Sequence, residues 1–305
     1  MRVGLIDVDG HNFPNLPLMK LSAWHKEQGD HVEFYDPMFS GHMDRVYMSK
    51  VFTFTPDYEY CIDADEIRKG GTGYEYPSGG ALLPSEVEHI YPDYDLYGIT
   101  DTAYGFLTRG CPRGCDFCIV KDKEGKRSVK VANLSEFWNG QKYISLLDPN
   151  FFACQDWKTL AEQLIASRAY IDFNQGIDIR IMTEEKVEHL KRMRIKDVHM
   201  AWDRYEDKDT ILPKFEMLRK ITSWDRRKLL VYVLCNFDTT HEQDLDRIYT
   251  LRDMGYDPYV MIYNKDKTKR TDTVRKLQRY VNGKPIFHTV ERFEDYDPHE
   301  RKKRN

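Results

Sequence analysis

Three cysteines stand close together near the middle of the sequence, at Cys111, Cys115 and Cys118. They are separated by three and then by two residues, in a segment that contains glycine and proline and follows a predicted strand. A loop with this spacing can turn three thiolates toward one centre, and thiolates are soft ligands that select zinc or an iron–sulfur cluster. The other three cysteines are scattered along the chain, so the six do not form the pattern of a disulfide framework.

The two kinds of metal site differ in the number of ligands that they need. A structural zinc site takes a fourth cysteine or histidine at a comparable spacing, but the nearest candidates, His89 and Cys154, lie more than twenty residues away. Three thiolates satisfy three corners of a [4Fe–4S] cube and leave one iron open to another ligand. The spacing therefore favours an iron–sulfur cluster, and the alternative is a zinc-stabilised nucleic-acid-binding module without catalysis.

The segment Thr108–Ile119 resembles the cluster-binding loop of the radical S-adenosylmethionine (radical SAM) superfamily. It has the pattern C-x3-C-x2-C with an aromatic residue, Phe117, directly before the last cysteine. The resemblance implies that Cys111, Cys115 and Cys118 hold a [4Fe–4S] cluster whose fourth iron binds the amino and carboxylate groups of SAM. It also implies that Phe117 lies beside the adenine of SAM.

Four further positions resemble SAM-binding positions of the family. Asp148 and Asn150 follow the second strand of the predicted core, where related proteins contact the SAM amino group. Gln175 and Arg180 lie in the third unit, in a segment similar to one that contacts the carboxylate or the ribose of SAM. An alternative for Asp148 is a turn carboxylate, because Pro149 and Asn150 are turn residues. An alternative for Arg180 is an ordinary ion pair. At the fourth strand, where the family often has Gly-x-Glu, this sequence departs from the pattern.

The resemblance implies an enzyme that cleaves SAM reductively to a 5′-deoxyadenosyl radical, which then acts on an unidentified substrate. It also implies an electron donor such as flavodoxin or ferredoxin. The Arg109–Pro112 opening of the cysteine segment is most similar to subgroups with an N-terminal cobalamin-binding-like Rossmann domain. Asp9 and His11 partly match the D-x-H-x-x-G signature of some cobalamin proteins, but Pro14 replaces its glycine. A domain without a ligand is therefore favoured, and a cobalamin-dependent radical SAM methylase is the alternative.

Strand and helix patterns alternate along most of the chain, which is typical of an α/β fold. Residues 1–75 predict a small Rossmann-like domain, and residues 76–103, rich in Pro, Gly, Asp and Tyr, predict a linker. Residues 104–265 predict a radical SAM core of six strand–helix units. Six units are too few for an eight-unit barrel, so we expect a partial (β/α)6 TIM-type barrel. Residues 266–305 predict a C-terminal helix and tail.

The expected elements are short and regularly spaced. The strands of the first domain are expected at Val3–Val8, His31–Tyr35, Arg45–Val51 and Glu66–Lys69, with helices at Leu18–Gln28 and Pro56–Ile62. The strands of the core are expected at Tyr104–Thr108, Tyr143–Leu147, Tyr170–Phe173, Asp197–Ala201, Leu229–Leu234 and Tyr259–Ile262.

The charge balance excludes a strong field over the whole molecule, because 46 basic residues face 50 acidic ones. No apolar stretch approaches the roughly 20 residues of a membrane-spanning helix, so we expect a cytoplasmic protein without a membrane partner. Basic residues gather locally at Lys121–Lys130 and Lys265–Arg270. One interpretation of these clusters is that they attract RNA or another nucleotide-bearing molecule as the substrate. The other interpretation is that they are solvated surface loops.

Overall fold

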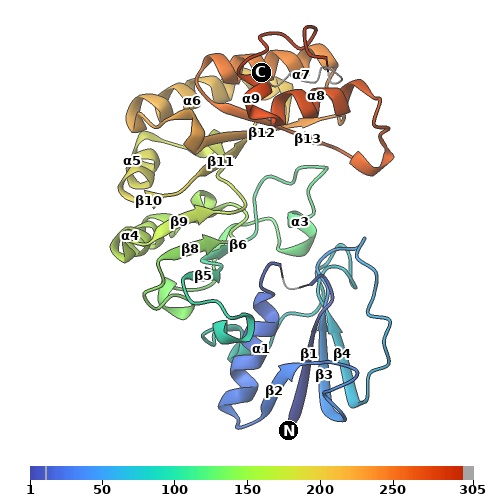
Figure 1. The fold of residues 1–305 in the computed structure, drawn as a ribbon. Coiled ribbons are helices and arrows are strands. Elements are labelled where there is room, and N and C mark those ends of the chain that lie inside the picture. Colours follow the sequence, from blue (N-terminus) through green and yellow to red (C-terminus); the bar gives the residue numbers. More distant parts are fainter. Residues whose placement is uncertain (11, 298–305) are drawn as a thin grey trace, which may run out of the picture. The chain divides into compact units, whose positions relative to one another are not determined.

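The computed structural model describes residues 1–10 and 12–297 (Figure 1). The chain divides into two compact units, Met1–Ile171 and Asp172–Asn305. His11 and the end of the predicted tail, from residue 298 on, lie outside the described residues. In the described part of the chain, no helix has both the length and the apolar character that crossing a bilayer requires.

Unit 1 begins with a four-stranded parallel sheet in the order β2-β1-β3-β4. The strands are β1 (Arg2–Asp7), β2 (His31–Phe34), β3 (Met43–Ser49) and β4 (Ala64–Gly70). Helix α1 (Leu16–Glu27) connects β1 to β2, and its Leu18 packs in one apolar cluster with Val3 and Leu5 of β1. This arrangement confirms the parallel α/β character predicted for the N-terminal part.

The start of α1 is fixed by Asn15, a buried side chain at the N-cap position. Its Oδ1 accepts the backbone N–H of Leu18 at 3.3 Å, and its Nδ2 donates to the Ser49 hydroxyl oxygen at 2.8 Å. One amide therefore satisfies a helix N–H and ties the helix to the end of β3.

The helix predicted at Pro56–Ile62 is wrong, because this segment is an irregular loop between β3 and β4. The Asp57 carboxylate accepts the backbone N–H of Tyr58 at 2.9 Å, the Tyr74 hydroxyl at 2.5 Å and the Lys69 ammonium at 2.9 Å. These bonds lower the pKa of Asp57 to about 2. An aspartate engaged with its own neighbours in this way competes with helix formation.

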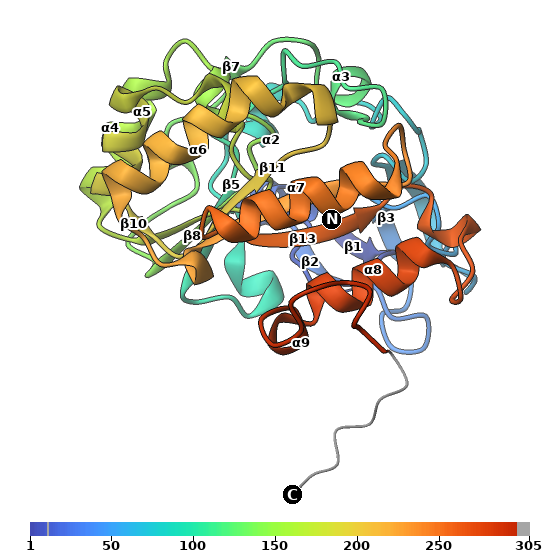
Figure 2. The ribbon, with the colours of Figure 1, turned by 90° about the horizontal axis from the view of Figure 1, so that it is seen from above.

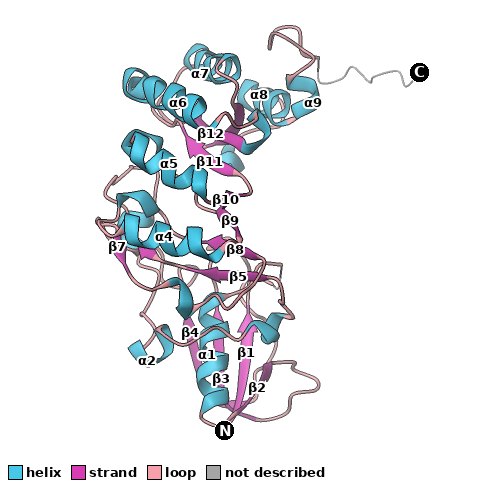
Figure 3. Cartoon of the chain, turned by 90° about the vertical axis from the view of Figure 1, so that its left-hand side faces the viewer, coloured by secondary structure: helices cyan, strands magenta, loops and turns pink. Residues whose placement is uncertain are grey.

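The segment predicted as a linker covers α1 with two short helical turns. These are α2 (Ser85–Glu88) and a 3-10 turn (Tyr94–Tyr97), and Figure 3 shows α2 beside α1. The Asp93 carboxylate accepts the Ser22 hydroxyl of α1 at 2.5 Å and the Lys26 ammonium at 2.6 Å. The segment is thus held on the helix by polar contacts, while its role as a domain boundary stays a prediction.

A second parallel sheet of unit 1 has the order β9-β8-β5. Its strands are β5 (Thr102–Gly105), β8 (Tyr143–Leu146) and β9 (Tyr170–Phe173), and β9 runs across the boundary between the units. Helix α4 (Trp157–Ser167) connects β8 to β9 and buries Leu160 and Leu164. The carboxyl ends of β5 and β8 therefore lie at the same edge of this sheet.

Unit 2 contains the parallel sheet β11-β12-β13. It also contains β10, which pairs with β9, the strand that crosses the boundary between the units. The strands are β10 (Arg194–Ile195), β11 (Val198–Ala201), β12 (Leu229–Cys235) and β13 (Asp257–Ile262). The helices are α5 (Glu184–Arg192), α6 (Lys208–Thr222), α7 (His241–Asp253), α8 (Thr273–Asn282) and α9 (Lys284–Phe287). Helices α7 and α8 pack on β13, as Figure 2 shows from above.

Each of the six strands predicted for the core is present, and a helical segment follows each of them. Only the boundaries differ, by one to three residues for most strands. The strands of the described residues form separate open sheets and do not close into a barrel. The α/β class is thus confirmed, and the six-unit partial barrel stays a prediction.

The strand ends of unit 2 are joined by Arg247 of α7, a fully buried arginine. Its guanidinium donates to the backbone oxygens of Trp202 at 2.7 Å, Asp203 at 2.8 Å and Leu234 at 2.8 Å. The same group donates to the Asp244 carboxylate at 2.5 Å, which balances its charge. One side chain thereby holds the segments that follow β11 and β12 in a fixed spacing.

Replacing Arg247 by lysine is expected to lower the free energy of unfolding by about 1–3 kcal/mol, because an ammonium cannot reach all of these oxygens at once. Urea denaturation measures this loss. The matched control is Arg227→Lys, since the Arg227 side chain is 82% exposed and an exposed change costs at most about 0.5 kcal/mol. Equal stability of the two variants would contradict a role for Arg247 in joining the strand ends.

Candidate metal centre

The three cysteines lie on one loop of unit 1 whose two ends are joined. Strands β6 (Thr108–Arg109) and β7 (Val129–Lys130) form an antiparallel pair on either side of the loop. Inside the loop that this pair encloses, the backbone N–H of Cys111 donates to the backbone oxygen of Gly125 at 3.1 Å. The loop therefore begins after the end of β5 and closes as a hairpin, beyond which the Val131 backbone N–H donates to the Leu107 oxygen at 2.9 Å.

Gly110, directly before the first cysteine, is required by this closure. Its φ is +84°, and a Cβ added there would lie 2.0 Å from the backbone oxygen of Arg127. The two sides of the loop approach each other so closely that only a residue without a side chain fits.

The three cysteine side chains have intermediate exposure, as has Phe117. The backbone N–H of Cys118 donates to the oxygen of Cys115 at 3.1 Å, which forms a tight turn between the last two cysteines. Helix α3 (Val120–Lys123) follows at once. Across the described residues, no group of three or more His, Cys, Asp or Glu side chains is arranged as a metal site.

The donor set nevertheless has the chemistry that a cluster needs. Three thiols within eight residues share one anchored loop, and metal-binding loops commonly take their final geometry with the metal. Asn150 is buried and donates from Nδ2 to Cys111 Sγ at 3.4 Å. Hydrogen bonds to cysteine sulfur are among the features that set the potential of iron–sulfur clusters. These residues fit a [4Fe–4S] cluster held by three cysteines.

Asp148 clamps the base of the cysteine loop from the neighbouring strand. It is 2% exposed, and its Oδ1 accepts the backbone N–H of Leu107 at 3.0 Å. Its Oδ2 accepts both the backbone N–H and the hydroxyl of Thr108, each at 2.6 Å. Burial raises the pKa of Asp148 to about 7, and these hydrogen bonds oppose that shift. Both oxygens hold the chain, and the contact with the SAM amino group stays a prediction.

Asn150 holds the same loop from a second point. Its backbone oxygen accepts the Ser128 hydroxyl at 3.0 Å, beside β7, while its amide contacts Cys111. The segment after β8 thus contacts the cysteine loop near its beginning and near its end. The sequence placed Asp148 and Asn150 near the cofactor but did not reveal this positioning role, whose partners lie about 20 to 40 residues away in the chain.

Gln175 and Arg180, the other two candidates, belong to unit 2. Gln175 is exposed, in the turn that follows β9. The Arg180 guanidinium donates to Asp178 at 2.7 Å and to Asp207 at 3.2 Å. Arg180 is therefore an ion-pair former in this structure, as the alternative interpretation had it, and its contact with SAM stays a prediction.

A polar group of side chains, which sequence reasoning missed, lies on one face of the unit 2 strands. His199 contacts the Tyr232 ring at 5.6 Å between centroids, and Tyr232 contacts Tyr259 at 5.7 Å. Among the described residues, Asp172 Oδ1 and His199 Nδ1 are buried without a hydrogen-bond partner. Burial raises the pKa of Asp172, and the nearby His199 opposes the shift. The signal in the sequence was a polar or tyrosine side chain at alternate strand positions.

Asp203 follows β11, at the place where the sequence departs from Gly-x-Glu. Burial raises the pKa of its carboxyl to about 6, against the opposing charges of Arg180 and Arg247. The folded state thus favours the neutral form, so this group weakens folding as pH rises from about 4 through about 6.

Replacing Asp203 by asparagine is expected to increase the free energy of unfolding at pH 8 by on the order of 2 kcal/mol, because the buried charge is removed. The gain should shrink as pH falls through about 6 and vanish near pH 4, where the aspartate is neutral in both states. Urea denaturation of both proteins across this range measures it. A gain that is independent of pH would contradict the assignment.

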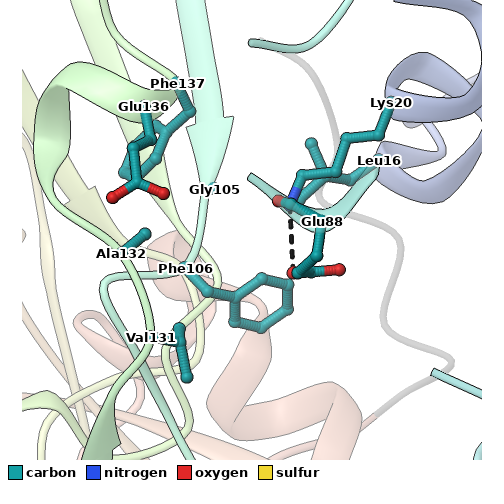
Figure 4. Close-up of a pocket in the computed structure, with 9 residues that line it drawn as sticks. All are labelled: Leu16, Lys20, Glu88, Gly105, Phe106, Val131, Ala132, Glu136 and Phe137. Carbon is teal, nitrogen blue, oxygen red and sulfur yellow. Dashed lines mark hydrogen bonds and ion pairs between the residues drawn. The ribbon is translucent and has the colours of Figure 1, made fainter. Parts of the chain in front are cut away.

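A small pocket of unit 1 lies between α1 and β5, and Figure 4 shows its lining. The Lys20 ammonium lies 3.0 Å from the Glu88 carboxylate and also donates to the Glu88 backbone oxygen. Burial lowers the pKa of Lys20. On the other side of the pocket, a Cβ at Gly105 would lie 2.4 Å from the Phe137 ring. The wall of the pocket is thus packed closely around an ion pair. We interpret this ion pair as a structural contact and not as part of a ligand site.

No family model and no curated protein matches this sequence. Among solved structures, the chain is similar to a radical S-adenosylmethionine methyltransferase, TsrM, from Kitasatospora setae, whose structure has cobalamin and a [4Fe–4S] cluster bound. The superposition has a TM-score of 0.60 at 12% sequence identity, and it covers 86% of this chain and 74% of that one. At this identity the likeness is one of fold alone, and the chain has a radical SAM-like α/β fold.

Proposed function

We propose that this chain is a radical SAM enzyme. The observation that carries the proposal is the C-x3-C-x2-C segment on an anchored loop at the carboxyl end of β5, in a chain with a radical SAM-like fold. In this proposal Cys111, Cys115 and Cys118 hold a [4Fe–4S] cluster and leave one iron for SAM. When bound, the cluster supplies the electron for cleavage of SAM to methionine and a 5′-deoxyadenosyl radical, which takes a hydrogen atom from an unidentified substrate.

The residues around the loop have separate tasks in this proposal. Asp148 and Thr108 fix the base of the loop, and Asn150 orients the first thiolate through its amide. Phe117 lies beside the adenine of SAM, and Gln175 and Arg180 contact its carboxylate or ribose. A flavodoxin or ferredoxin type of donor supplies the electron, and a reducing cytoplasm suits an oxygen-sensitive cluster.

The test is reductive SAM cleavage by the full chain, reconstituted with iron and sulfide without oxygen. With dithionite as reductant we expect 5′-deoxyadenosine to form from SAM, and we expect none when dithionite is left out. Fully reconstituted protein that binds SAM but forms no 5′-deoxyadenosine with dithionite would overturn the proposal.

A second candidate function is a cobalamin-dependent methylase, and the cobalamin bound in the solved structure of similar fold favours it. In unit 1 the loops at the carboxyl end of the first sheet contact one another closely. The Asp9 carboxylate accepts the Thr55 hydroxyl at 2.6 Å, and a Cβ at Gly71 would lie 2.4 Å from the Lys50 oxygen. Spectra of the protein after incubation with hydroxocobalamin and gel filtration test this candidate. Retained corrinoid supports it, and 5′-deoxyadenosine formation without any corrinoid counts against it.

A further inference from the structure

Three arginines of unit 2 line one hollow in the surface. The hollow has a volume of about 330 Å³ and is lined by Arg270, Arg275, Gln278 and Arg279. Arg270 comes from the loop after β13, and the other three come from one side of α8. Figure 1 shows α8 running along β13, the last strand of its sheet. No acidic side chain belongs to the lining of this hollow.

The hollow is built on fixed side chains, because the edge of β13 holds its wall. Gln278 Nε2 donates to the backbone oxygen of Val260 at 3.0 Å. Arg275 donates from Nε to the Thr268 hydroxyl oxygen at 2.6 Å and from Nη2 to the Lys265 oxygen at 2.8 Å. Gln278 and Arg275 are therefore held in place before any ligand arrives, which lowers the entropic cost of binding.

The three arginines of the hollow are not paired with acidic side chains in the described part of the chain. Arg279 Nε is buried and has no hydrogen-bond partner in that part of the chain. Arg275 and Arg279 are four residues apart on one helix, a spacing at which like charges repel. Three guanidinium groups in this situation are stabilised by an anion that accepts several N–H groups at once.

We infer that this hollow binds a phosphate group of a ligand. A phosphate oxyanion matches the planar fork of a guanidinium and can accept bonds from more than one arginine. The volume leaves room for groups attached to the phosphate. The loop between β13 and α8 carries Lys265, Lys267 and Lys269 against Asp266 and Asp272, so its remaining net charge is positive and adds to the potential around the hollow. The site does not depend on the proposed cluster chemistry, and it gives the predicted nucleotide-bearing partner a defined point of attachment.

The test is calorimetric titration of the full chain at low salt, without added iron or SAM. The probes are inorganic phosphate, uridine monophosphate and a short single-stranded RNA, which share the phosphate but differ in what carries it. Arg279→Gln is expected to weaken binding by about tenfold, since it removes a charged donor of the hollow. Arg270→Gln, at an exposed position, gives the same test without disturbing the helix.

The matched control is Lys267→Gln, which removes the same charge from the adjoining loop but does not line the hollow. Its affinity should stay within about twofold of the original, because Lys267 does not line the hollow and acts on a bound anion only at longer range, where solvent and salt screen its charge. Similar affinity for phosphate and for the nucleotide identifies a small phosphorylated ligand, and much tighter RNA binding with a steep salt dependence identifies a nucleic-acid backbone. No binding of any probe, or equal weakening by Lys267→Gln and Arg279→Gln, would overturn the inference.

Discussion

Replacing Cys115 by alanine is expected to remove the iron–sulfur cluster and with it all formation of 5′-deoxyadenosine. Cys115 is the middle thiol of the three, and the nearest cysteine outside the segment, Cys154, is buried beyond β8. The loss of one ligand leaves two thiolates, too few for a [4Fe–4S] cluster bound by three. The measurements are the absorbance near 400 nm of the anaerobically reconstituted protein, as is typical of such clusters, and product formation from SAM.

The control for this change is Cys61→Ala. Cys61 is an exposed thiol in the loop before β4, far from the cysteine segment in the sequence. Its loss should leave both the absorbance and the activity at the level of the original protein. An alanine at Cys115 that keeps the cluster, or an alanine at Cys61 that loses it, would contradict the assignment of the ligands.

Replacing Gly110 by alanine is expected to reduce cluster content by on the order of tenfold, the factor that about 1.4 kcal/mol of lost binding free energy produces. The new Cβ would lie 2.0 Å from the Arg127 backbone oxygen, so the base of the loop must open. The positive φ adds about 1–2 kcal/mol for a residue with a side chain. Iron per chain after reconstitution, measured beside the thermal midpoint, separates cluster loss from global unfolding.

Gly114 provides the matched control, because it precedes the second cysteine as Gly110 precedes the first. Its φ is also positive, at +55°, but a Cβ there meets no atom within 4 Å. Gly114→Ala therefore carries the cost of the backbone conformation without the collision. The two variants should differ clearly in iron content, and equal losses would show that the closure at Gly110 does not position the cysteines.

The longer strands of this fold could be predicted because each one is marked locally, whereas the two-residue strands β7 and β10 were not predicted. The strand at Tyr170–Phe173 was predicted with its observed bounds, since apolar and polar residues alternate there between a helix and a turn. The start of α7 also carries a local contact, because the Thr240 hydroxyl before it accepts the Gln243 backbone N–H at 3.3 Å. Such signals lie within a few residues of the element that they define.

The features that the sequence did not reveal depend on contacts between distant residues. The carboxylate of Asp148 holds Thr108 from 40 residues further along the chain, and no local pattern announces that pairing. The loop at Pro56–Ile62 stays irregular because Asp57 binds Lys69 and Tyr74, which follow it by more than ten residues. Burial set by tertiary packing also raises the pKa of Asp203, which a sequence alone leaves at its ordinary value.

The most direct test of the central claim is metal analysis of the anaerobically reconstituted chain, with iron, acid-labile sulfide and zinc measured in one sample. We expect about four iron atoms and about four sulfides per chain. A colourless protein without iron, or a protein with about one zinc per chain in place of iron, would contradict it.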